Sequence, residues 1–134
     1  MTGQAAIEVG TELAGDDHRV TMDDMILFAD EGVKDIHTDD EIARAAGLPA
    51  PVAPGAQLIA YIHEMLYREY GFDSVSGTVL DVRFRALVVA GDTVTACGRV
   101  TGSEGVRLDL DVWCQNQRGE QVVAGTAQVS VTPA

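Results

Sequence analysis

His37 is the residue of this chain best suited to acid–base chemistry. It lies in the stretch VKDIHTDDEIARAAGLPAPVAPGAQL (residues 33–58), ahead of an acidic turn, a helix of small residues and a Pro-Gly pair that opens a second helix. A histidine can take up and release a proton near neutral pH. The free N–H groups at a helix N-terminus can hold a developing negative charge. This combination is suited to proton transfer on a carbonyl compound.

Three carboxylates near His37 in the sequence are candidates for the second acid–base group. Asp30 and Glu31 end a predicted helix, from which they could turn toward His37, and Asp35 lies close enough to orient its ring. A carboxylate beside a dry site can have its pKa tuned for base work. The alternative for Asp30 and Glu31 is an ordinary solvated charge at a helix end.

Composition and charge exclude several classes of function. The 134 residues fit one domain, residues 1–134, and 46% of them are hydrophobic, so a core is easily supplied. The formal net charge is −12, with 21 acidic residues against nine basic ones, which argues against nucleic acids and anionic membranes as partners. No apolar run approaches the roughly 20 residues that cross a bilayer, and residues 1–10 lack the pattern of a signal peptide. We therefore expect a cytoplasmic protein.

Arg83 and Arg85 form the best candidate for a basic patch in this acidic chain. They are two residues apart in a predicted strand, so their side chains lie on the same side of it. Such a pair can contact a phosphate group of a ligand. The alternative is a pair of solvated strand charges.

Other kinds of chemistry find little support in the sequence. Cys97 and Cys114 lie in predicted strands, where a disulfide is conceivable, but buried free thiols are expected in a cytosolic chain. His18, in a predicted turn, and His63, in a predicted helix, are interpreted as structural or exposed. There is no spacing of metal ligands, no glycine-rich phosphate loop and no G-x-S-x-G motif. We expect neither a metal nor a cofactor.

The periodicity predicts helices followed by strands. Thr21 caps a predicted helix over residues 22–32, and Thr38 caps a second over residues 39–47 in a capping box with Glu41. A proline-rich stretch then leads into a long helix over residues 56–71 with a buried apolar stripe. A short strand is expected over residues 5–13 before a turn at 15–17, and four alternating runs form an antiparallel meander over residues 76–89, 92–102, 105–117 and 120–131.

Five blocks in this order resemble the MaoC-like, (R)-specific enoyl hydratase family. They are IEVGTEL, VTMDDMILFAD, IHTDDEIARAAGLPAPVAPG, VRFRALVVAGDTVTACGRV and NQRGEQVVAGTAQVSV, and they cover the chain from about Ile7 to Val131. The resemblance implies an α+β hotdog domain, in which a curved antiparallel sheet wraps a long central helix, and usually a dimer. We accordingly expect a homodimer, because pairing also covers exposed sheet edges.

The resemblance also implies a catalytic arrangement. In the family, an Asp and a His in a G-D-x-N-P-I-H loop hold a water that adds across the double bond of an enoyl thioester, and a backbone N–H at the start of the central helix polarises the carbonyl. His37 matches that histidine, and Gly55 matches the glycine of the helix entry, with Pro54 in place of a histidine and Ala56 after it. These three residues are the expected oxyanion and substrate-binding site.

The sequence departs from the family pattern at one important position. Gly32 stands where the catalytic Asp is expected, five residues before His37, and Lys34 and Asp35 replace the Asn and Pro of the motif. The loop is therefore remodelled as well as substituted.

Three functions remain open. The first is a hydro-lyase, an enoyl-thioester hydratase or 3-hydroxyacyl dehydratase in fatty acid or polyketide metabolism, in which His37 works with a relocated carboxylate. The second is a diverged enzyme, such as an isomerase or cyclase, in which His37 is the main acid–base group. The third is a non-catalytic subunit of a heterodimer or an acyl-binding protein. The sequence specifies neither the acyl chain nor its carrier, coenzyme A or a carrier protein.

Overall fold

The computed structural model describes residues 6–29, 32–72 and 77–131 of the chain. Within these residues, the chain forms five strands and three helices. The elements are β1 (Glu12–Arg19), α1 (Met22–Phe28), α2 (Asp40–Ala45), α3 (Gly55–Tyr70), β2 (Val79–Phe84), β3 (Thr93–Glu104), β4 (Arg107–Gln115) and β5 (Gln121–Ser130).

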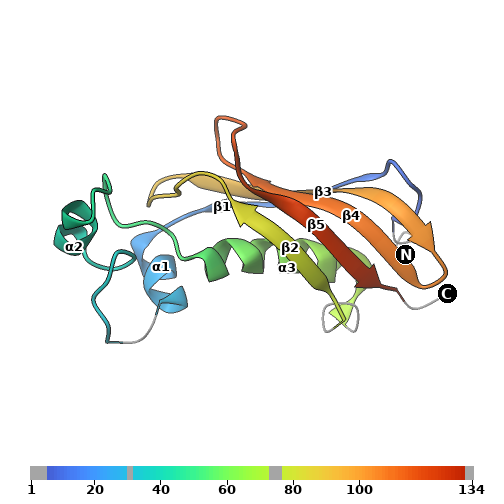
Figure 1. The fold of residues 1–134 in the computed structure, drawn as a ribbon, viewed down its shortest axis with the longest axis horizontal. Helices are drawn as coiled ribbons and strands as arrows, with labels where there is room; N and C mark the ends of the chain where they lie inside the picture. The colour runs from blue at the N-terminus through green and yellow to red at the C-terminus, as the bar shows by residue number, and fades with distance from the viewer. Residues whose placement is uncertain (1–5, 30–31, 73–76, 132–134) are drawn as a thin grey trace.

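One antiparallel sheet lies along the long helix α3. The strand order is β1-β3-β4-β5-β2, and α3 contacts β1, β3 and β4 (Figure 1). Leu58, Ile62 and Leu66 of α3 pack against sheet residues such as Val100 and Leu110, and all five are buried. This packing follows from the spacing of the apolar residues. The three helix residues recur at helical spacing on one face of α3, and that face lies against the alternating apolar positions of the strands. The expected α+β fold with a curved sheet and a central helix is confirmed.

The helices α1 and α2 lie beyond the start of α3, at one end of the molecule (Figure 1). Thr21 caps α1 as predicted, since its side chain accepts a hydrogen bond from the Asp24 N–H, but the helix ends at Phe28 rather than at residue 32. The predicted cap of α2 was wrong. Asp39 caps α2 by accepting from the Ile42 N–H, whereas Thr38 donates to the Val33 carbonyl oxygen.

The predicted turn at residues 15–17 was also wrong. These residues lie inside β1, where a β-bulge between Ala14 and Asp17 takes up the extra residue in the pairing with β3. Turn-forming residues such as Gly and Asp are also the residues that bulges use. As a consequence, His18 is a strand residue that pairs with Val94, rather than part of a turn.

The predicted meander holds for β3, β4 and β5 but not for β2. This strand pairs with β5, and its first and last pairs are Val79 with Gln128 and Phe84 with Val123. The chain from β2 to β3 therefore crosses to another part of the sheet, and on the way Val89 forms an isolated bridge with Val52.

Both cysteines are buried free thiols, as predicted. Cys97 of β3 lies opposite Trp113, and Cys114 of β4 lies opposite Ala96, so the two positions are offset by one residue. Successive side chains of a strand point to opposite faces, so the thiols lie on opposite sides of the sheet. Among the described residues, no helix is both long and apolar enough to cross a membrane.

Candidate active site

The loop before α2 holds the His37 ring in one defined orientation. His37 Nδ1 lies 2.8 Å from the carbonyl oxygen of Val52. A carbonyl oxygen can only accept, so Nδ1 carries the hydrogen of this bond and the neutral ring has its lone pair at Nε2. Within the described part of the chain, Nε2 has no hydrogen-bonding partner. The ring is therefore arranged as a base whose basic nitrogen is free.

Val52 ties this loop to the start of α3. Its N–H donates to the Ile36 carbonyl oxygen at 3.0 Å, while its own carbonyl oxygen accepts from His37. The next residue, Ala53, donates to Val88 at 2.7 Å. The three steps along the chain from Val52 to Gly55 span at most about 11 Å even when fully extended. The His37 ring and the first turn of α3 thus belong to one region.

The first turn of α3 leaves backbone N–H groups available to a ligand. Pro54 precedes the helix and provides no side-chain cap, and the Gln57 N–H bonds back to the Pro54 carbonyl oxygen at 3.0 Å. The N–H groups of Gly55 and Ala56 are left at the positive end of the helix dipole. A carbonyl oxygen that gains negative charge would be stabilised there.

Gly55 has no room for a side chain. A Cβ atom at this position would lie 2.7 Å from the Phe84 ring at the end of β2. Glycine thus permits close contact between the last residue of β2 and the start of α3. Pro54 before it is buried, and Ala56 after it is exposed.

The Asp35 carboxylate is engaged by the backbone of the loop. Its Oδ1 accepts from the His37 N–H at 2.8 Å. The main-chain carbonyl oxygen of Asp35 accepts from the N–H groups of Thr38 and Asp39. This is the arrangement of a side chain that stabilises a turn. Val52, rather than Asp35, bonds the His37 ring.

The remaining predicted carboxylates cannot be placed relative to His37, because Asp30 and Glu31 lie outside the described residues. Gly32, where the family motif has an Asp, has a φ of +76°, and nothing lies within 4 Å of the position of its missing Cβ atom. No carboxylate among the described residues bonds the His37 ring, and no group of His, Cys, Asp or Glu in them is arranged to hold a metal.

A hollow of about 620 Å³ lies beside the His37 loop. Its lining includes Ile26 and Leu27 of α1 and, from the loop, Val33 and Thr38. Thr38 directly follows His37 in the chain. The buried apolar side chains of α3 and of the sheet pack together in the core.

The two arginines expected to contact a phosphate lie at the end of β2 that contacts the start of α3. Arg83 is in this strand and Arg85 follows it, and both are exposed. Neither takes part in an ion pair with the described residues. They are therefore available cations near Phe84, the residue that covers Gly55.

Gln57 was missed by the sequence analysis. It is fully buried in the first turn of α3, and its side-chain Nε2 donates to the Tyr61 hydroxyl at 2.7 Å. The signal was a polar residue directly before Leu58, where the apolar stripe of this helix begins. A periodicity analysis that counts only apolar positions passes over such a residue.

Five antiparallel strands along one long helix, with a histidine loop against the start of that helix, define a hotdog-fold protein. The chain belongs to the MaoC-like domain family, which it matches over residues 5–133. A search of curated proteins found no match.

Solved structures support this assignment. A monoamine oxidase regulatory protein from Archaeoglobus fulgidus has 27% identity and a TM-score of 0.74, with 95% of this chain and 93% of that chain covered. The (R)-hydratase from A. caviae involved in PHA biosynthesis has 23% identity and a TM-score of 0.79, with 95% and 98% covered. The (R)-hydratase PhaJ1 from Pseudomonas aeruginosa has 24% identity and a TM-score of 0.78, with 95% and 83% covered. At these last two identities the likeness shows the shared fold.

Proposed function

We propose that this protein is a hydratase of an enoyl thioester or, in the reverse direction, a dehydratase of a 3-hydroxyacyl thioester, with His37 as its acid–base group. The observation that carries the proposal is the bond from His37 Nδ1 to the Val52 carbonyl oxygen. It leaves Nε2 as a free base and ties the ring to Val52, three residues before α3 begins. Membership of the MaoC-like family and the hydratases among the solved relatives support the same reaction class.

The reaction assigns one task to each part of the site. The Gly55 and Ala56 N–H groups bind the thioester carbonyl oxygen and stabilise the negative charge that builds on it. His37 Nε2 takes a proton from water as the water oxygen bonds to C3, and the same nitrogen returns the proton to C2. Dehydration is the reverse of these steps. The Asp30 and Glu31 carboxylates are the candidates for a second group that holds the water.

We propose that the active form is a homodimer. In the strand order, β2 is an edge of the sheet, and Val79 and Phe84 at its two ends are 60% and 53% exposed. An exposed apolar edge strand invites pairing, and a second copy of the chain is the simplest partner. Size-exclusion chromatography with light scattering tests this, and a monomer at micromolar concentration would refute it.

The activity is tested by hydration of crotonyl-CoA, measured as the loss of its conjugated absorbance. We expect the native protein to hydrate it and His37→Gln to lose about 10² to 10⁴ of the rate, the usual contribution of one acid–base group. His63→Gln is the matched control, because His63 lies on α3 and has no contact with the His37 loop among the described hydrogen bonds. Equal rates in native protein and His37→Gln would refute the assignment of His37.

A second function is favoured by the absence of a side chain at Gly32 and by the engagement of Asp35 in a turn. In this alternative, His37 is the only acid–base group, and the reaction is an isomerisation or cyclisation that moves a proton without adding water. Exchange of C2 or C4 protons of an acyl thioester with deuterated solvent, without hydration, would favour it. A protein that binds thioesters but catalyses neither exchange nor hydration would be a non-catalytic subunit.

A further inference from the structure

The first turn of α3 contains a buried polar atom without a partner. Gln57 is fully buried, and its Nε2 donates to the Tyr61 hydroxyl, but its Oε1 has no hydrogen-bonding partner among the residues that the structure describes. An unpaired buried acceptor is unfavourable, and such groups are rare in folded proteins. An amide oxygen held in this state is an acceptor that a ligand can satisfy.

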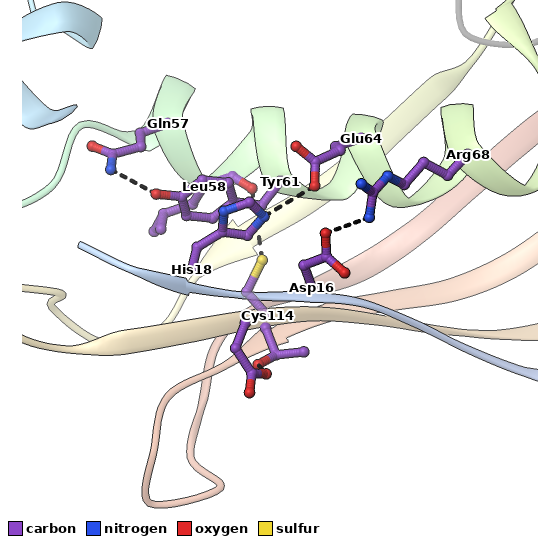
Figure 2. A network of polar contacts seen from close by, with 10 residues as sticks. Asp16, His18, Gln57, Leu58, Tyr61, Glu64, Arg68 and Cys114 are labelled. Carbon is purple, nitrogen blue, oxygen red and sulfur yellow. Dashed lines mark hydrogen bonds and ion pairs between the residues drawn. The ribbon is translucent and has the colours of Figure 1, made fainter.

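A network of polar contacts fixes the orientation of this amide. The Tyr61 ring stacks on His18, with ring centres 4.1 Å apart and planes 2° from parallel, and His18 Nε2 lies 3.1 Å from Glu64 Oε1 (Figure 2). The β-bulge in β1 allows His18 to face α3. The Tyr61 hydroxyl is therefore held in place, and with it the amide of Gln57.

The Tyr61 hydroxyl remains protonated in this network. Burial raises its pKa above the ordinary value, against the opposing effect of the bond from Gln57, and the charge of Asp24 raises the pKa further. The Tyr61 hydroxyl oxygen accepts from Gln57 Nε2 at 2.7 Å, so the nitrogen of the amide faces Tyr61. The oxygen of the amide is thereby left on the other side.

The unpaired oxygen points toward the start of the helix. Side chains of an α-helix lean toward its N-terminus, and Figure 2 shows Gln57 Oε1 on the side away from Tyr61, where α3 begins. Along the helix axis, Gln57 lies only about 3 Å beyond Gly55. The Gln57 amide therefore lies in the same helical turn as the N–H groups of Gly55 and Ala56.

We propose that Gln57 is a specificity-determining residue that accepts a hydrogen bond from the 3-hydroxyl group of a 3-hydroxyacyl thioester, or from the water that becomes this hydroxyl. The inference rests on the proposed function, since it concerns the same substrate. An amide takes no proton, so Gln57 only orients the oxygen. The proton of the water goes to His37 Nε2, the C3–O bond forms, and the electron pair of the double bond moves to C2, which takes the proton back.

The proposal predicts a binding preference that is measurable without turnover. In a His37→Gln background, we expect calorimetry to show 3-hydroxybutyryl-CoA binding about fivefold more tightly than butyryl-CoA, the effect of one neutral hydrogen bond. Adding Gln57→Leu and Tyr61→Phe together should make the two affinities equal. The exposed Gln128→Leu is the matched control and should retain the preference.

The same variants separate this role from a structural one. Replacing both members of the Gln57–Tyr61 pair removes the unpaired acceptor and leaves no new one, so the melting temperature should stay the same or rise. A lower melting temperature, a preference that survives the double substitution, or no preference at the start would overturn the proposal. If the protein prefers 3-hydroxybutyryl-CoA but the native form does not hydrate crotonyl-CoA, the proposed function is refuted and the role of Gln57 stands. If the native protein hydrates crotonyl-CoA but shows no such preference, the role of Gln57 is refuted and the proposed function stands.

Discussion

The contact between Gly55 and the Phe84 ring is a residue-scale feature that can be tested by a double-mutant cycle. We expect Gly55→Ala to destabilise the protein by about 1 kcal/mol, because the new methyl group displaces the ring from a position 2.7 Å away. In a Phe84→Ala background, the same change should stabilise by about 0.5–1 kcal/mol, since only the better helix propensity of alanine remains. Urea unfolding of the four proteins measures both terms. Equal effects in the two backgrounds would show that the ring does not restrict this position.

The thiol of Cys114 is a second test at this scale. Burial raises the pKa of Cys114 to about 12, and only the thiolate reacts with Ellman's reagent. At pH 8 about one thiol in ten thousand is then ionised, compared with about a quarter for an ordinary cysteine of pKa near 8.5. In Cys97→Ser protein, we expect the remaining thiol to react at least about a thousandfold faster in guanidinium than in buffer.

That variant isolates Cys114, because Cys97, whose pKa burial also raises, is removed. The matching Cys114→Ser protein reports on Cys97. Rapid reaction of Cys114 in the folded protein would contradict its burial beneath the sheet.

At the residue scale, the sequence predicted types of residue better than their contacts. His37 was found because its position in the chain resembles a known motif, but its bond to Val52 joins residues 15 apart and has no local signal. Thr21 was correctly predicted as a cap, whereas Asp39 replaced Thr38 at the second helix. Both side chains have the chemistry of a cap, and the turn around Asp35 decides between them.

At the scale of elements, the pairing of β2 with β5 depends on a glycine. A Cβ atom on Gly125 would lie 2.6 Å from the Cα atom of Val82 and even closer to the Asp81 carbonyl oxygen. Backbone atoms of a paired strand cannot move aside as a side chain can. We expect Gly125→Ala to destabilise the protein by about 3 kcal/mol, at the upper end of the effect of overpacking.

Gly77→Ala is the matched control for this prediction. Its new Cβ atom would meet only Ser130, at an ordinary distance of 3.7 Å. We expect a change within about 0.5 kcal/mol of the native protein in the same urea titration. A comparable loss in both variants would mean that alanine is disfavoured for reasons other than the contact with β2.

The number and order of the elements were predictable, but two features of the sheet were not. Alternation of apolar residues identifies a strand without naming its partner, so β2 was assigned next to β3 instead of β5. The bulge in β1 was interpreted as a turn because Gly15 and Asp16 suit both. Long-range pairing decided each case, and a single sequence does not display it.

At the scale of the whole molecule, the net charge of −12 opposes the binding of an anionic carrier. We expect Arg83→Ala with Arg85→Ala to raise the KM for crotonyl-CoA about tenfold, through the loss of two cations near its phosphates. The KM for the crotonyl thioester of pantetheine, which lacks those phosphates, should not change. Steady-state kinetics at low salt measures both values. The same increase for both substrates would show that these arginines do not contact phosphate.

The backbone path from Val88 through Ala53 and Val52 to His37 has an evolutionary consequence. In each hydrogen bond of this path, the donor, the acceptor or both are main-chain groups. The imidazole of His37 is the one side chain that takes part. Mutations at the other positions change what surrounds the ring while leaving its anchor in place. Related proteins that share this path can therefore accumulate substitutions around the ligand and change the preferred substrate. The His37 ring keeps its position throughout.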